Sequence, residues 1–192
     1  MKPASFDYLL AETSEEALQA LAQYGDEATI IAGGQSLLAM LNMRLAQPQL
    51  VIDIARIEAL NYIQLSDDYI QVGATTTQAQ LEAWPQLAQI SPLLTQAIPH
   101  IGHFQTRNRG TVCGSIAHAD PSSELPLCLA LLNGQVVLRS ENGRRALSAE
   151  SFQTGMLETA REAEEMIEAV HFPVCQSDNG YAFNEVARRH GD

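Results

Sequence analysis

Two glycine-rich segments constrain the fold of this chain more than any other feature. The first, residues 32–36 (Ala-Gly-Gly-Gln-Ser), follows a strand-like run at 28–31 and precedes leucines with helical spacing. The second runs from Gly110 to Ser115. Glycine lets the backbone adopt positive φ and approach a ligand closely, and free N–H groups at a helix start attract anions. We therefore expect the two segments to hold the pyrophosphate of a dinucleotide.

The charge distribution supports an anion site at both segments. The chain has a net charge of −12, yet residues 28–52 contain no acid and carry only Arg44. Residues 83–119 are also free of acids and carry Arg107 and Arg109. Each arginine is equally consistent with phosphate neutralisation and with a solvated loop. Because core segments are poor in acids in any protein, the pattern supports the anion site without establishing it.

Composition narrows the class of protein. With 192 residues and 46% apolar residues the chain is long enough for a substantial core, and its acidity argues against nucleic acid or an anionic membrane as partner. The longest uncharged stretch, 83–106, contains three prolines, so we expect no membrane span. Three widely spaced cysteines do not indicate a disulfide framework, and no signal peptide is visible. We expect a cytoplasmic protein.

The first quarter of the chain alternates strand and helix. Residues 13–16 match a capping box, and the helix that they open ends at Gly25. A strand at 28–32, a helix from about Ser36 and a strand at 50–54 follow, an order that predicts a small, mainly parallel sheet. The leucines at 37, 38, 41 and 45 are expected to pack in the core.

The pattern changes after Arg56 to that of an α+β region with mainly antiparallel strands. Asp120 is expected to cap a helix that ends near Leu132, with Glu124 in its first turn. The other expected elements are hairpins at 62–72 and around Asn142-Gly143, helices reaching Trp84 and spanning 92–98, and strands at 167–172 and 181–186.

In its motifs and their order, the chain resembles the FAD-binding (medium) subunit of molybdenum-containing hydroxylases. This group includes carbon monoxide dehydrogenase and xanthine dehydrogenase. The motifs that carry the resemblance span the whole chain: residues 32–38, the strand ending at Asp53, residues 107–121, Glu124-Leu125-Pro126 and residues 188–192. Two departures are a cysteine at position 113, where the family usually has glycine, and an end at Asp192, where the family continues into a further lobe.

The resemblance implies an α+β fold of the vanillyl-alcohol oxidase and p-cresol methylhydroxylase type. The FAD-binding domain would span 1–175, with a small βαβ-like lobe at about 1–56 and a larger, mainly antiparallel lobe at about 57–175. Residues 176–192 would begin a C-terminal domain that is truncated here. With that domain missing, the isoalloxazine would be poorly covered and FAD retention weakened.

The resemblance also implies the contacts of the cofactor. FAD would lie between the lobes, with its pyrophosphate on the two glycine segments. The residues implied are Ile31, Ala32, Gly33, Gly34, Gln35, Ser36, Leu37, Leu38, Ile101, Thr111, Val112, Cys113, Gly114, Ser115, Glu124, Ile167 and Asn184. No catalytic side chain and no metal ligand is expected, because His100 and His103 lack a third ligand and nothing orients Cys113 and His118 as a nucleophile pair.

The function implied is that of an oxidoreductase component, the FAD-carrying electron-transfer subunit of a molybdenum-containing hydroxylase. Electrons would arrive from a large molybdopterin subunit through 2Fe–2S clusters on a small subunit and leave through FAD to an outside acceptor. Neither the substrate nor the choice between NAD and a quinone follows from the sequence. Two alternatives stay open: a stand-alone flavin oxidoreductase similar to UDP-N-acetylenolpyruvoylglucosamine reductase, and a truncated, flavin-free interaction module. The sequence lacks the GxGxxG and GxxxxGK[ST] motifs of other nucleotide-binding folds.

Overall fold

The structure is a computed structural model that describes residues 2–175, 179–188 and 191. Its strands are β1 (Asp7–Leu10), β2 (Ala28–Ile31), β3 (Leu50–Asp53), β4 (Ile63–Leu65), β5 (Tyr69–Gly73), β6 (Gln135–Ser140), β7 (Gly143–Ser148), β8 (Gln153–Gly155), β9 (Glu158–Thr159) and β10 (Met166–Pro173). Its α-helices are α1 (Ser14–Tyr24), α2 (Leu37–Asn42), α3 (Gln78–Glu82), α4 (Leu87–Ile90), α5 (Pro92–Ala97), α6 (Phe104–Arg107), α7 (Val112–His118), α8 (Glu124–Leu131) and α9 (Ala149–Phe152). Three short 3-10 helices are η1 (Gly25–Glu27), η2 (Glu58–Leu60) and η3 (Ile98–His100).

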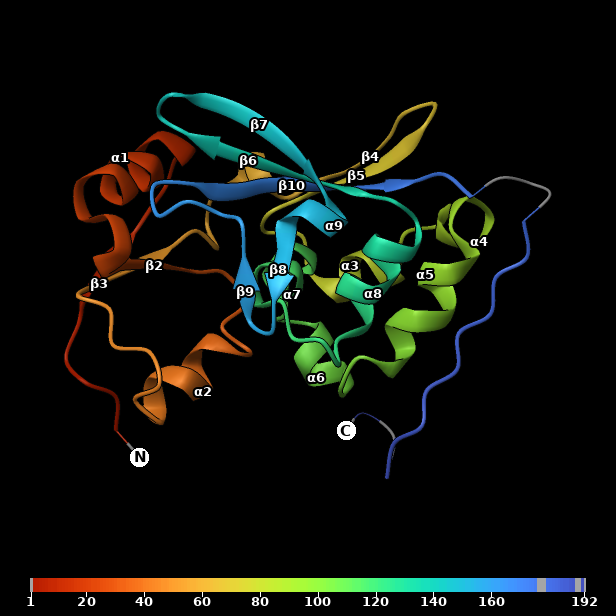
Figure 1. The fold of residues 1–192 in the computed structure, drawn as a ribbon, viewed down its shortest axis with the longest axis horizontal. Helices are drawn as coiled ribbons and strands as arrows, with labels where there is room; N and C mark the ends of the chain where they lie inside the picture. Colours follow the sequence, from red (N-terminus) through yellow and green to blue (C-terminus); the bar gives the residue numbers. More distant parts are fainter. Residues whose placement is uncertain (1, 176–178, 189–190, 192) are drawn as a thin grey trace.

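A small N-terminal lobe contains the parallel sheet that the sequence predicts. Its three strands are arranged in the order β1-β3-β2, and both pairings are parallel. Thr13 caps α1 by accepting a hydrogen bond from the N–H of Glu16 (3.2 Å), as expected. The carboxylate of Glu16 accepts from the N–H of Glu12 (2.8 Å), one residue before the predicted donor. Figure 1 shows this lobe at the left, with α2 below the sheet.

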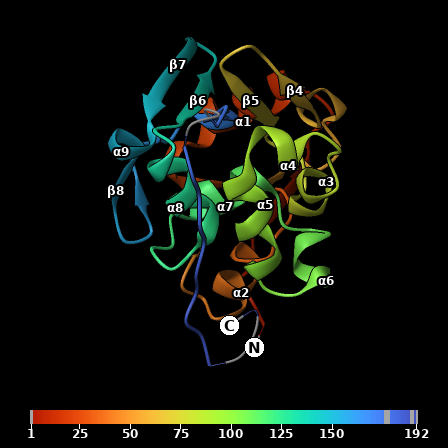
Figure 2. The same cartoon turned by 90° about the vertical axis from the view of Figure 1, so that its right-hand side faces the viewer.

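The larger lobe is built on a five-stranded antiparallel sheet. Its order is β4-β5-β10-β6-β7, so the last long strand of the chain lies at the centre. The sheet runs across the top of Figure 1, and helices α3 to α8 lie beneath it. Figure 2 shows the same separation from the side, with α5 and α7 below the strands. Together the two sheets confirm the α+β fold class.

Charged side chains tie the lobes together beside this sheet. Arg139 on β6 binds Glu15 of α1 (2.6 Å) and Glu168 of β10 (3.2 Å), and Arg144 of β7 also binds Glu168. Most buried apolar residues of both lobes form a single cluster, which includes Leu21 of α1 and Phe172 of β10. The lobes are therefore held in a defined arrangement around the space between them.

The helix expected from Asp120 begins later, at Glu124. The Asp120 carboxylate accepts hydrogen bonds from the N–H and the hydroxyl of Ser122 (2.9 and 2.7 Å) and so closes a local turn instead of capping a helix. Ser123 is the N-cap residue. The prediction that Asp120 is the N-cap residue of this helix is therefore wrong.

The prediction that the leucines at 37, 38, 41 and 45 pack in the core is confirmed for Leu41 and wrong for Leu38 and Leu45. Arg44 adopts a φ of 59°, which ends α2 after six residues and leaves Leu45 outside the helix. Leu41 is 2% exposed, but Leu38 is 46% and Leu45 70% exposed. Leu37 is half-buried and faces a cleft between the lobes.

The strand expected at 181–186 is an extended segment without a strand partner among the described residues. It is attached to α5 by Gln96, which donates to the carbonyl of Tyr181 (3.2 Å) and accepts from the N–H of Phe183 (3.1 Å). Arg189, His190 and Asp192, which carry part of the resemblance, lie outside the described residues, as do residues 176–178 at the start of the expected C-terminal domain. No described helix has the length and apolar character that a membrane crossing requires.

Candidate functional site

A cleft of about 410 Å³ lies between the two lobes. The N-terminal lobe contributes β2, the loop that follows it and part of α2. The larger lobe contributes the loop before α7, α7 itself and the segment leading into β10. The two glycine segments, which are about 75 residues apart in sequence, thus face one cleft. Its volume is in the range of ordinary ligand sites.

The first glycine segment offers main-chain donors to this cleft. Within the described chain the N–H groups of residues 33–36 donate to no protein acceptor. The Gln35 side chain turns back and donates to the carbonyl of Gly33 (3.1 Å). The helix that follows has six residues, too short for a large dipole, so the anion-binding capacity of this segment resides in its amides.

The two glycine segments touch each other at Gly33. A Cβ on Gly33 would collide with the carbonyl oxygen of Arg109 and lie 2.8 Å from Cα of Gly110. The neighbouring Gly34 has a φ of 70°, a conformation that side chains with a Cβ rarely adopt. Both glycines are thus required by the geometry, the first for close approach and the second for its φ angle.

The second segment uses part of its hydrogen-bonding capacity internally. The Thr111 hydroxyl caps α7 by accepting from the N–H of Gly114 (3.0 Å). The main chain around Thr111 also pairs with the start of α3, through Gln78 N–H to Gly110 carbonyl (2.8 Å) and Val112 N–H to Thr76 carbonyl (3.0 Å). These contacts fix the loop, and they leave the Gly114 amide less free than the sequence suggested.

Gln78 contributes a polar group that the sequence analysis missed. Its side chain is 5% exposed, lines the cleft and lies beside Gly110, whose Cβ would be 3.2 Å from Oε1 of Gln78. That oxygen is buried and has no hydrogen-bond partner. Because a buried acceptor without a donor is costly, a donor supplied here by a ligand would stabilise the site.

Among the described residues that line the cleft, Glu124 is the carboxylic acid, and Arg161 and His118 carry the basic side chains. Burial raises the pKa of Glu124 above its ordinary value, and the neighbouring Glu185 acts in the same direction. Burial also lowers the pKa of Arg161, whose guanidinium nevertheless remains charged at neutral pH. The other residues of the described lining, apart from His118, are apolar or uncharged.

Most residues that the resemblance implied line this cleft. They are Ile31, Ala32, Gly33, Gly34, Gln35, Ser36, Leu37, Ile101, Thr111, Cys113, Gly114, Ser115, Glu124 and Ile167. Leu38, Val112 and Asn184 are not in the lining. Val112 is fully buried in the core, while Leu38 and Asn184 are exposed. The structure adds further lining residues for which the sequence gave no signal, among them Met40, Ala46, Gln78, Leu157 and Arg161, and it also places His118 in the lining.

The structure also shows the surroundings of three further candidates, Arg107, Arg109 and Cys113. Arg107 pairs with Glu82 (2.9 Å) and donates to the carbonyl of Ile101 (3.1 Å), so it fixes a loop instead of meeting a phosphate. Arg109 lines a separate polar cavity next to Gly33. Burial strongly raises the pKa of the Cys113 thiol, which keeps it protonated. The described residues contain no cluster of three or more His, Cys, Asp or Glu that could hold a metal ion.

Comparisons with known proteins agree with this geometry. The family described as the FAD binding domain in molybdopterin dehydrogenase matches residues 4–175. Over the whole chain, the 6-hydroxypseudooxynicotine dehydrogenase complex subunit alpha of Paenarthrobacter nicotinovorans is 43% identical, and the carbon monoxide dehydrogenase medium chain of Hydrogenophaga pseudoflava is 35% identical. The chain covers 65% of the first of these proteins and 67% of the second.

Solved structures give the same result. Quinoline 2-oxidoreductase from Pseudomonas putida 86 superposes with a TM-score of 0.95 at 37% identity, and all of this chain matches 66% of that one. The chain therefore belongs to the family of FAD-binding domains of molybdopterin dehydrogenases. It spans about two thirds of the length of the relatives it matches.

Proposed function

We propose that this chain binds FAD in the cleft between its lobes and acts as the FAD-carrying electron-transfer subunit of a molybdenum-containing hydroxylase. The observation that carries the proposal is the meeting of both glycine segments in one cleft, in a chain of this family. The amides of residues 33–36 would hold the pyrophosphate, together with the loop that begins at Thr111.

The residues present fit this cofactor. The main-chain approach at Gly33 leaves no room for a side chain, as expected where backbone amides must surround a phosphate group. The unpartnered oxygen of Gln78 matches a hydroxyl donor, which the ribityl chain and the ribose of FAD both carry. The apolar parts of the lining, such as Ile31, Ile101 and Ile167, suit the flat faces of its ring systems.

The protein's part is to bind and orient the cofactor, which itself supplies conversion between one-electron and two-electron transfer. Main-chain donors would hold the anionic bridge in a preset arrangement, because Thr111 fixes the second loop through Gly114 and Gly33 packs the first loop against it. Glu124 lies at the cleft with a raised pKa, so a ligand that covers it favours its protonated form. No side chain of the chain is assigned a covalent or proton-transfer step.

The wider setting is also part of the proposal. We propose a large molybdopterin subunit and a small iron–sulfur subunit as partners, because relatives include a dehydrogenase complex subunit and a medium chain. We further propose the division into lobes at about 1–56 and 57–175, with residues from 176 on starting a further domain. Three free cysteines support a reducing compartment, the cytoplasm.

The test is to purify the chain, incubate it with FAD, remove free flavin by gel filtration and record the visible spectrum. We expect a bound flavin spectrum, and acid release should yield FAD and not FMN. A chain that stays colourless at millimolar FAD would refute the cofactor assignment and favour a flavin-free interaction module. Flavin reduction by NADPH with turnover in the absence of partners would instead favour a stand-alone oxidoreductase.

A further inference from the structure

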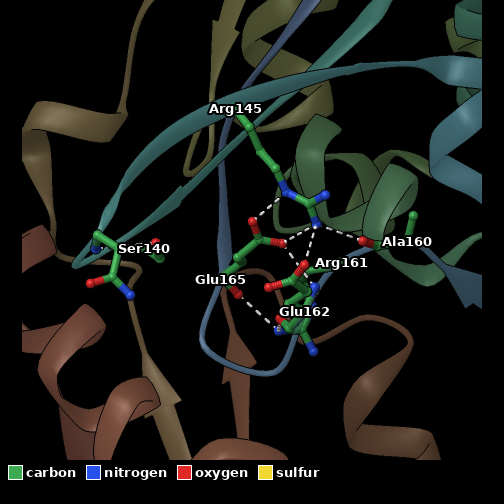
Figure 3. A network of polar contacts seen from close by, with 7 residues as sticks. Ser140, Arg145, Ala160, Arg161, Glu162 and Glu165 are labelled. Carbon is green, nitrogen blue, oxygen red and sulfur yellow. Dashed lines mark hydrogen bonds and ion pairs between the residues drawn. The ribbon is translucent and has the colours of Figure 1, made fainter.

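Arg161 lies in the loop between β9 and β10 and is held there by main-chain oxygens. Its Nη1 donates to the carbonyls of Glu162 (2.9 Å), Ala163 (3.3 Å) and Glu165 (2.8 Å). Figure 3 shows the arrangement, in which the carbonyl of Glu165 faces Arg161 while its carboxylate faces Arg145. The loop is thus folded around one end of the guanidinium.

The rest of this guanidinium remains available. Across the described residues, Nε and Nη2 of Arg161 donate to no protein acceptor, and no carboxylate lies within ion-pair distance of the group. Glu165, the acid of the same loop whose charge acts on Arg161, is bound by two nitrogens of Arg145 (2.6 and 2.8 Å). Arginine has five N–H donors in a planar fork, so three are left for another molecule.

Arg161 is one of the residues that line the cleft. Arg161 lines the cleft together with Leu157 and Ile167, which flank the same loop. The charge of Asp26, two residues before β2, also acts on Arg161 and raises its pKa. Strand β2 leads into the first glycine segment, so Arg161 and the site proposed for the pyrophosphate line the same cleft.

We propose that Arg161 binds the adenine base of the dinucleotide, with its planar face or its free N–H groups. This inference rests on the proposed function, because it takes FAD as the ligand. Guanidinium groups are weakly hydrated and stack on electron-rich aromatic rings. Adenine is such a ring and carries ring nitrogens that accept hydrogen bonds, whereas oxidised isoalloxazine is electron-poor. The apolar neighbours Leu157 and Ile167 complete a site for a flat base.

The experiment compares the affinities of FAD, ADP and FMN by isothermal titration calorimetry, using the wild-type chain and three variants. Arg161→Leu should weaken FAD and ADP by about tenfold, the size of one good charge-assisted contact, and leave FMN unchanged. Arg161→Lys keeps the charge but loses the planar fork, so we expect a smaller loss for the same two ligands. Arg56→Leu is the matched control: Arg56 is exposed, lies outside the cleft lining and should change none of the affinities.

The outcomes separate the two proposals. If the wild-type chain binds no FAD, the proposed function fails, and this inference fails with it. If the wild type binds FAD and ADP, and Arg161→Leu and Arg161→Lys bind ADP equally well, only the assignment of Arg161 is overturned. Loss of FMN with unchanged ADP would also overturn it, by placing Arg161 at the isoalloxazine end. Near-UV circular dichroism identifies a misfolded leucine variant, and the lysine variant then decides the question.

Discussion

Replacing Gly33 with alanine should separate the two glycine segments and weaken FAD binding. The added Cβ would collide with the carbonyl oxygen of Arg109 and lie 2.7 Å from the attached carbon. Non-bonded carbons are normally about 3.5–4.0 Å apart, so the segments must move apart by roughly 1 Å. The atoms involved are all main-chain atoms, which cannot turn aside as a side chain would.

The structure allows the size of both effects to be worked out. Overpacking of this kind costs about 1–3 kcal/mol of folding free energy. A displacement of about 1 Å also breaks the alignment of one or two amide hydrogen bonds to a charged group, each worth about 1.5–3 kcal/mol. We therefore expect Gly33→Ala to raise the dissociation constant for FAD by about tenfold to a hundredfold.

The assay is calorimetric titration with FAD, together with urea unfolding of the apoprotein. Two other glycines provide controls. Gly34→Ala imposes backbone strain of about 1–2 kcal/mol, but its Cβ would meet only flexible side chains, at 3.1–3.2 Å, and should affect FAD less than Gly33→Ala. Gly180→Ala has nothing within 4 Å and should be neutral. Wild-type FAD affinity in Gly33→Ala would refute the idea that the contact between the segments shapes the site.

Three further predictions concern single side chains. Gln78→Met removes a buried acceptor that has no donor, so the apoprotein should melt at the same or a higher temperature while FAD affinity falls by about tenfold; a lower melting temperature with unchanged affinity would contradict this. Hydrogen bonds from Arg144 hold the pKa of Glu168 below its ordinary value, so its stabilisation is present above the unfolded pKa and is lost as pH falls through the folded pKa. Urea unfolding from pH 7 to pH 3 should therefore show a smaller loss of stability in Glu168→Gln than in the wild type, and equal losses would refute the argument. Thr111→Val removes the cap on the N–H of Gly114 and should lower the free energy of unfolding by about 1 kcal/mol, which urea titration at pH 7 would detect.

Local features of the fold could be predicted from the sequence because neighbouring residues determine them. Side-chain chemistry and hydrophobic periodicity within a few residues determine three such features. They are the cap at Thr13, the parallel strands of the first lobe and the hairpin at Asn142-Gly143. The prediction that Asp120 caps a helix was wrong for a related reason, because the same carboxylate can cap a helix or close a turn. Sequence alone does not decide between these local hydrogen bonds.

The glycine segments of the cleft could be predicted, but its other key groups could not. Gly33 and Gly34 form a conspicuous Gly-Gly pair in the sequence, and both line the cleft. Gln78 and Arg161 belong to no motif, and they reach the cleft only because α3 and the β9–β10 loop pack beside the glycine segments. Such positions depend on contacts between distant parts of the chain. Neither the hydrophobic periodicity nor the composition of the sequence predicts these contacts.

The charge pattern and the fold together explain how an acidic chain would accept an anionic cofactor. Both acid-free stretches of the sequence contribute to the cleft, whose described lining contains one carboxylate, Glu124, balanced by Arg161. Other acids, such as Glu15 and Glu168, pair with arginines of the sheet outside the cleft lining. The cleft is therefore close to neutral within a chain of net charge −12. Because no cluster of lysine and arginine side chains lines it, the attraction for a diphosphate must come mainly from main-chain amides, whose positions depend on the contact at Gly33.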